Sequence, residues 1–259
     1  MVHEDTPDRE VRRYLCRRVE RVPSLDGQLV DPVWSALPWS EPFVDITGDD
    51  ARAPRYRTRM KMGWDDRHLY VGGDLEEPHV WGTLTEKNSR LYEDNDFELF
   101  VDPDGDGRDY YEFEINALGT IWELSLPRPY REGGIAESGC NIPGLVSAVH
   151  VRGTVNDPSD LDDGWSVTIA IPWEGLARYN PGRATPPRTG DVWKVNFSRV
   201  QWRHEVQAGR YVRVPPHGMV RPAGLHADEY EHPEDNWVWS PQGVVNMHIP
   251  ARWGEVVFG

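Results

Sequence analysis

Apolar and polar side chains alternate residue by residue in several short segments, and this period of two constrains the fold most. In residues 95–102, Phe97, Leu99 and Val101 share one face and Glu98 lies on the other. Residues 110–116, 165–173 and 192–202 alternate in the same way. Successive side chains of a β-strand point to opposite faces, so these segments are predicted to be half-buried strands. Shorter strands are predicted over residues 58–64, 68–75, 120–126, 146–154 and 253–258.

Turn-forming residues separate the predicted strands. The sequences WDDRH, DPDGDGRD, NALGT, DLDDGW and PRTGD are rich in the Asp, Asn, Gly and Pro that β-turns prefer. Helix is predicted only around residues 11–19 and just after Pro172. A chain of 259 residues can bury one large core without disulfides. We therefore predict an all-β, antiparallel β-sandwich over residues 23–259, preceded by an N-terminal arm over residues 1–22.

The charge balance argues against two classes of partner. The chain has 43 acidic and 28 basic side chains, a net charge of −15, which repels nucleic-acid phosphates and anionic membrane surfaces. No stretch reaches the roughly 18 apolar residues of a membrane span. The N-terminus has no apolar signal region, so we expect a cytoplasmic protein, or a secreted one if a signal was removed. Cys16 and Cys140 are expected to be reduced thiols.

Acidic side chains gather on one predicted sheet face. If residues 95–102 and 110–116 pair as a hairpin through DPDGDGRD, then Glu98, Glu112 and Glu114 project from the same face, with Tyr110 beside them. A solvated outer face of a sandwich would show the same alternation, and the period alone favours that interpretation.

The number of aromatic residues favours a binding site. A core of this size does not need 12 tryptophans, and Trp and Tyr rings pack well on sugar rings whose hydroxyls bind nearby polar groups. Trp81, Trp122 and Trp239 are left undecided between core and site. Aromatic residues beside polar positions or in loops are Tyr92, Tyr110, Trp202 and Trp237. Those on apolar faces, predicted to be core, are Trp34, Trp64, Trp165, Trp193 and Trp253.

Six ordered segments carry a resemblance to a known family. They are DGQLVDPVW, GWDDRHLYVGG, YEDNDFELFVDPDGDGRDYYEFEIN, DDGWSVTIAIPW, GDVWKVNFSRVQ and WSPQGVVNMHIPARWGEVVF. From about Asp26 to Phe258 the chain resembles the family 9 carbohydrate-binding modules, in particular their stand-alone family 9-like branch. The resemblance implies a β-sandwich of the DOMON-like type that binds a saccharide or short glycan.

The resemblance also implies roles for individual residues. Tyr92 stands where the first of two sugar-clamping tryptophans would be, and Glu98 matches a sugar-binding glutamate. Glu114 stands where family members carry an arginine, and the second clamp falls at or beside Met247 and His248. Further ligand-binding candidates are Glu112, Asn196, Arg199, Trp202, Trp237 and Trp239.

A calcium site is a further expectation. Asp102, Asp104, Asp106 and Asp109 in DPDGDGRD offer hard oxygen ligands, and calcium sites are known in the family that the chain resembles. A tight acidic turn is an equally good interpretation, because the glutamate that an EF-hand requires is replaced by Phe113. No other cofactor is expected.

Two other classes of function stay open. Paired carboxylates such as Glu98 and Glu114 could act as acid and base in an enzyme that cleaves a small glycoside. Met219, Met247 and His248 keep a haem-binding domain of the DOMON-like type as a weaker alternative. The long segment over residues 215–235 is predicted to be a functional or mobile loop. Other histidines that could serve as bases or ligands are His204, His217, His226 and His232.

Overall fold

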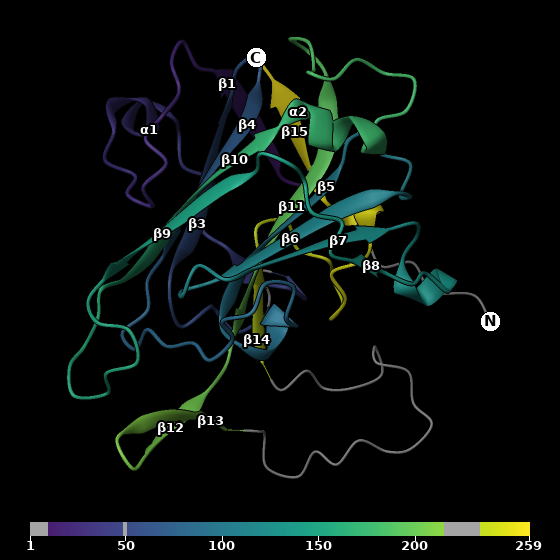
Figure 1. The fold of residues 1–259 in the computed structure, drawn as a ribbon. Coiled ribbons are helices and arrows are strands. Elements are labelled where there is room, and N and C mark those ends of the chain that lie inside the picture. The colour runs from purple at the N-terminus through teal and green to yellow at the C-terminus, as the bar shows by residue number, and fades with distance from the viewer. Residues whose placement is uncertain (1–9, 49–50, 215–233) are drawn as a thin grey trace.

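The computed structural model describes residues 10–48, 51–214 and 234–259, and in them β-strands form two layers around one core (Figure 1). The first layer contains β2 (Val44–Asp45), β5 (Asp96–Asp102), β6 (Tyr110–Asn116), β7 (Ile121–Leu126), β8 (Glu137–Ser138), β11 (Val192–Gln201), β14 (Asp235–Val238) and β15 (Gly254–Phe258). The second contains β3 (Thr58–Trp64), β4 (His68–Leu75), β9 (Val146–Arg152) and β10 (Gly164–Pro172). A separate hairpin joins β12 (His204–Gln207) to β13 (Arg210–Arg213).

One strand, β1 (Arg13–Arg18), joins the two layers. Its residues 13–16 pair in parallel with β15, and its residues 17–18 pair in parallel with β3. The strand order is therefore continuous, β8-β7-β6-β5-β11-β15-β1-β3-β4-β10-β9, and the sheet curls over the core at β1. The predicted β-sandwich is confirmed, and its pairs are antiparallel except for those that β1 makes.

The core lies between the inner faces of the two layers. Phe97, Leu99 and Phe113 from the first layer pack in one cluster with Val71 and Ile169 from the second. Alternate residues of the same strands point outward, which leaves each layer with a second face of different composition. The strands that were predicted from the alternation form at the expected places, and β3 and β4 have the predicted bounds. The five tryptophans assigned to the core are all buried: Trp34, Trp64, Trp165, Trp193 and Trp253.

The helix predicted over residues 11–19 is wrong, because residues 13–18 form β1. Tyr14 and Cys16 are buried while their neighbours in the strand are exposed, which is the period of a strand. The partner strand β15 lies at the other end of the sequence, so no local pattern indicates the pairing. Part of the predicted N-terminal arm thus belongs to the sheet.

Helices are short and lie outside the sheets. At α1 (Pro32–Ala36), the Asp31 side chain accepts a hydrogen bond from the Val33 N–H and Pro32 occupies the first turn, so the helix begins there. Its Trp34 packs with Tyr70 and Ala170 on the outer face of the second layer. The helix predicted after Pro172 is confirmed as α2. The other elements are α2 (Trp173–Leu176) and the 3-10 turns η1 (Leu91–Glu93), η2 (Tyr130–Glu132), η3 (Ala177–Tyr179) and η5 (Pro250–Arg252).

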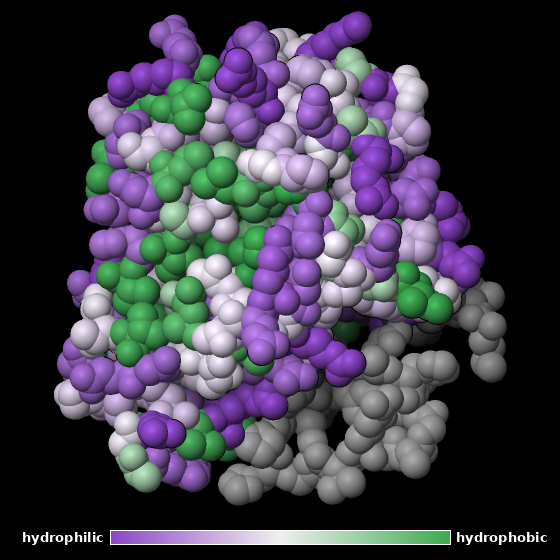
Figure 2. Space-filling model, in the orientation of Figure 1, coloured by the Kyte–Doolittle hydropathy of each residue, from purple (hydrophilic) through white to green (hydrophobic). Residues whose placement is uncertain are grey.

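The outer surface is mixed. β9 is the edge strand of the second layer, and its Val149 and Val151 are only half-buried. Figure 2 shows apolar surface between charged side chains on the side where Figure 1 places β9. Among the helices of the described residues, none combines the length and the apolar character that a membrane crossing requires.

Candidate functional site

Four carboxylates gather on the outer face of β5 and β6. Even-numbered residues of these strands point away from the core, because the odd-numbered ones fill it. Glu98 lies directly opposite Glu114 on β6 and opposite Ser198 on β11. The hairpin and the shared face were both predicted from the sequence. We call the acidic residues of this face the acid face: Asp96, Glu98, Glu112 and Glu114.

The acid face is buried although it lies outside the core. Its side chains have exposed fractions between 0% for Asp96 and 5% for Glu98 and Glu112. Asp96 accepts a hydrogen bond from the Val200 N–H, yet its second carboxylate oxygen has no partner. One oxygen each of Glu112 and Glu114 is also buried without a partner.

No basic side chain of the described residues forms an ion pair with the acid face. The basic side chains pair with other acids, among them the buried Asp74, Glu77 and Glu123. Burial is the main cause that raises the pKa of all four carboxyl groups of the acid face. The charge of Glu98 raises the pKa of the other three further. The four groups therefore need protons or a bound cation to lie so close together in a region of low polarity.

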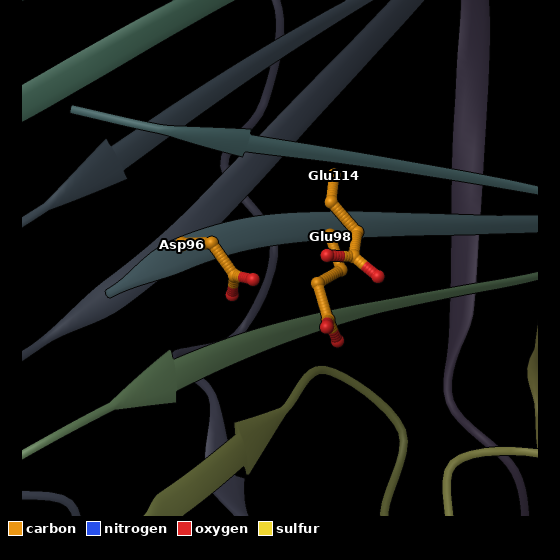
Figure 3. Close-up of side chains that lie close together, drawn as sticks. All are labelled: Asp96, Glu98 and Glu114. Carbon is orange, nitrogen blue, oxygen red and sulfur yellow. The ribbon is translucent and has the colours of Figure 1, made fainter. Parts of the chain in front are cut away.

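Three of these groups converge most closely. Figure 3 shows the carboxylates of Asp96, Glu98 and Glu114 on the same side of the sheet. One oxygen from each lies within 4.8 Å of the others. Asp96 and Glu98 come from one strand and Glu114 from its neighbour, so the pairing register sets this arrangement.

Two exposed tyrosines lie beside the acid face. The ring of Tyr92 lies 6.0 Å from that of Trp122, which stands directly opposite Glu114 on the neighbouring strand. The ring of Tyr130 lies 4.6 Å from that of His248. Burial, followed by the charges of Glu112 and Glu114, raises the pKa of Tyr130, and Glu114 also adds to the raised pKa of Tyr92. We call these four rings the aromatic rim: Tyr92, Trp122, Tyr130 and His248.

Neighbouring elements hold the rim in place. The Trp202 Nε1–H donates to the carbonyl oxygen of Tyr92 at 2.9 Å, and the Arg213 guanidinium lies over the Trp202 ring. On the other side, the Tyr110 hydroxyl lies 2.9 Å from Nδ1 of His248. Trp202 is therefore a support for Tyr92 rather than an exposed surface, since only 7% of it is accessible.

Asn196 holds the C-terminal segment against the first layer. Its Nδ2–H donates to the carbonyl oxygen of Ser240, and its Oδ1 accepts from the Ser240 N–H. It is completely buried on the acid-face side of β11, where Ser198 donates to Asn236. Asn196 therefore positions the segment that carries Met247 and His248.

Three of the residues proposed as ligand-binding lie elsewhere. Arg199 points into the interior, as its odd position on β11 implies, and its guanidinium lies 3.4 Å from the Glu77 carboxylate. Trp237 and Trp239 are 2% and 0% exposed in the main core. The structure thus does not place these three side chains at the acid face.

The predicted calcium loop is a turn whose carboxylates bind backbone groups. Asp102 accepts from the N–H groups of Gly105 and Gly107, and Asp104 and Asp106 accept from the residues two positions ahead. Carboxylate oxygens of Asp102, Asp104 and Asp106 lie within 4.8 Å of one another, whereas Asp109 is not in this group. These bonds account for the acidic turn, and calcium there stays a prediction.

The residues behind the haem alternative are only partly described. Met247 is 7% exposed in a small apolar cluster with Phe100 and Trp253, and the Trp253 Nε1–H donates to its carbonyl oxygen. His248 packs against Tyr110 and Phe100. Met219, His217, His226, His232 and most of the predicted 215–235 loop lie outside the described residues.

Sequence reasoning did not select Asp96 or Tyr130 and left Trp122 undecided. Asp96 could have been found, because it lies two residues before Glu98 on the same strand and therefore points to the same face. Tyr130 lies in the short turn η2, where no period indicates the direction of a side chain. Trp122 lies two residues before Leu124 on β7 and points to the same outer face. Its position opposite Glu114 follows only from the pairing register of β6 and β7.

Comparisons with known proteins agree with this fold. The model of the carbohydrate family 9 binding domain-like family matches residues 25–126. The exoglucanase XynX of Acetivibrio thermocellus is 25% identical over 227 residues, which are 83% of this chain and 18% of the relative. The chain spans less than a fifth of the curated relatives that it matches.

Solved structures share the fold over nearly the whole chain. A candidate carbohydrate-binding protein from Bacteroides uniformis has a TM-score of 0.64 at 18% identity, covering 96% of this chain and 100% of its own. A family 9 carbohydrate-binding module from Caldicellulosiruptor kristjanssonii in complex with cellotriose has a TM-score of 0.56 at 16% identity, covering 95% and 93%. A module from the same organism in complex with glucose has a TM-score of 0.56 at 17% identity, covering 96% of both chains. The similarity to family 9 carbohydrate-binding modules that the sequence indicates is confirmed.

Proposed function

We propose that this protein, which is similar to family 9 carbohydrate-binding modules, binds a saccharide at the aromatic rim beside the acid face. One observation carries the proposal. Tyr92 and Tyr130 are 42% and 44% exposed, each is supported by a second ring, and both lie near buried carboxylates.

The chemistry of the rim suits a sugar ring. The C–H face of a pyranose packs on an aromatic ring, while its hydroxyls bind a small number of fixed polar groups. Tyr92 and Tyr130 supply the rings, and Glu112 and Glu114 supply acceptors that burial keeps in fixed positions. Because these glutamates are almost fully covered, we propose that the saccharide reaches them with its edge and lies mainly on the tyrosines.

The comparisons support a class of ligand. The two Caldicellulosiruptor kristjanssonii structures contain cellotriose and glucose. We propose glucose and short β-linked glucose chains as the first ligands for this protein.

Isothermal titration calorimetry tests the proposal. Wild type is titrated with glucose, cellobiose, cellotriose and xylobiose, and then compared with Tyr92→Ala. Trp39→Ala is the matched control, because Trp39 is a half-buried ring that lies over Arg59 and Lys61 on the outer face of the second layer. We expect saturable heat that Tyr92→Ala weakens and Trp39→Ala preserves. Equal loss in both variants, or no heat with any sugar, would refute the proposed site.

Glycoside cleavage is the second candidate. Glu98 and Glu114 stand opposite each other on neighbouring strands, and burial raises the pKa of both carboxyl groups, as a general acid requires. Incubation with cellotriose followed by measurement of new reducing ends tests this function. Release that stops in Glu98→Gln would support an enzyme, and stable cellotriose over a day would leave binding alone.

A further inference from the structure

The oxygens of Asp96, Glu98 and Glu114 form a compact group in which negative charge is not compensated. They come within 4.8 Å of one another, and each parent side chain is at most 5% exposed (Figure 3). Burying a carboxylate without a partner is strongly unfavourable, and a second and third carboxylate beside it add repulsion.

Two other buried acids, Glu77 and Asp94, have hydrogen-bond donors on both carboxylate oxygens. Glu77 accepts from Asn95, Trp165 and Gln201 and pairs with Arg199. The fold therefore supplies partners where a buried carboxylate is structural.

Asp94 is a second example. Its two oxygens accept from the backbone of Thr83 and Leu84, from the Thr83 hydroxyl and from Asn116. The acid face differs, since Asp96, Glu112 and Glu114 each keep a buried oxygen that has no partner. Glu112, which has one of these oxygens, is not part of the group of three whose oxygens lie within 4.8 Å of one another. Three of the four acids on this face thus each have a buried oxygen without the donors that Glu77 and Asp94 receive.

A divalent cation satisfies this arrangement. Carboxylates are hard oxygen ligands, and calcium takes six to eight oxygens at 2.3–2.6 Å, so two ligands on opposite sides of it are about 5 Å apart. Magnesium gives up its bound waters reluctantly, whereas calcium accepts several protein carboxylates at once. A group of carboxylates at most 5% exposed therefore suits calcium better than magnesium.

We propose that Asp96, Glu98 and Glu114 bind one divalent cation, calcium in preference to magnesium, with Glu112 beside the site. The cation neutralises the buried charge of the acid face and ties β5 to β6. The site is separate from the acidic turn of Asp102, whose carboxylates bind backbone N–H groups. The proposal rests on the closeness of these carboxylates and on their unpartnered buried oxygens, and it does not depend on the binding of a saccharide.

Thermal unfolding of the chelator-treated protein tests the site. We expect calcium at about 100 times its Kd to raise the Tm by roughly 5–10 °C, from mass action and the usual entropy of unfolding of a domain of this size. Magnesium at the same concentration should raise it less. In Glu114→Gln the calcium response should be lost. Asp104→Asn/Asp106→Asn is the matched control, because it removes two carboxylates from the other acidic group and should keep the response.

Terbium luminescence gives a second readout that needs no stability change. Trp122 stands opposite Glu114 in the sheet, so excitation of the tryptophan should sensitise a terbium ion bound at the acid face. We expect emission that calcium displaces, and that Glu98→Gln and Glu114→Gln each reduce at least tenfold. A Tm that calcium leaves unchanged in wild type would overturn the proposal. So would a calcium response that persists in Glu114→Gln or is lost in Asp104→Asn/Asp106→Asn.

Discussion

Replacement of Arg199 by methionine should destabilise the fold and leave the acid face intact. Arg199 is completely buried between the layers, where Nη1 donates to the Thr58 hydroxyl at 2.9 Å and to the Glu76 carbonyl oxygen at 3.0 Å. Its guanidinium also donates to Gln201 and lies 3.4 Å from the Glu77 carboxylate. Methionine fills similar space, so the main loss is the charge and its donors.

The expected cost follows from the buried charge that remains. Removal of one partner of a buried ion pair leaves the other uncompensated and costs about 3–5 kcal/mol. Glu77 keeps three donors, from Asn95, Trp165 and Gln201, which places the cost near the lower end of that range. In Glu77→Gln the arginine is the uncompensated charge. In the double variant neither charge remains, so the double variant should be more stable than the sum of the two single losses implies, by about 1–3 kcal/mol.

Urea unfolding followed by tryptophan fluorescence measures these differences. With a slope of about 3 kcal/mol/M, a loss of 3 kcal/mol moves the midpoint by about 1 M. A midpoint shift below about 0.3 M, or losses that add in the double variant, would refute the assignment of Arg199 to a buried ion pair. Loss of saccharide binding in Arg199→Met with an unchanged midpoint would contradict its placement away from the acid face.

Three further predictions concern other features of the structure. Tyr130→Ala should lower saccharide affinity about fivefold, because one exposed ring contributes about 1 kcal/mol, and calorimetry checks this against wild type. Gly254→Ala should lower the unfolding free energy by about 1–3 kcal/mol, because the added Cβ would lie 2.2 Å from the Trp239 ring; thermal unfolding measures it, and an unchanged Tm would contradict the packing. Cys16 should resist a thiol reagent in the folded protein while Cys140 reacts, since burial is complete for the first and partial for the second and raises the pKa of Cys16 well above its usual value. Equal rates in the Cys16→Ala and Cys140→Ala variants would contradict this difference.

The strands that could be predicted from the sequence are those in which apolar and polar residues alternate. β3 and β4 begin and end as expected, and the hairpin of β5 and β6 forms through the acidic turn. β1 was missed because its partners lie far away in the sequence, so a short charged segment with two buried residues resembled a helix. The two-residue strands β2 and β8 are too short to show any period.

The candidate site was predictable to the extent that it lies on paired strands. Glu98, Glu112 and Glu114 share a face because the period of two and the hairpin fix their direction. Arg199 follows Ser198, which lies opposite Glu98, so its side chain points to the other face of the sheet, into the interior. Tyr130 belongs to a turn that tertiary packing places, and local patterning does not encode such a position.

A crystal structure of the protein with cellotriose would show directly where a saccharide binds. We expect a sugar ring on Tyr92 or Tyr130, with hydroxyls toward Glu112 and Glu114. At a cellotriose concentration of about 100 times the Kd, the crystals would contain the ligand at high occupancy. A saccharide bound on the second layer, or in the 310 Å³ cavity beside Asn180 and Trp193, would contradict it.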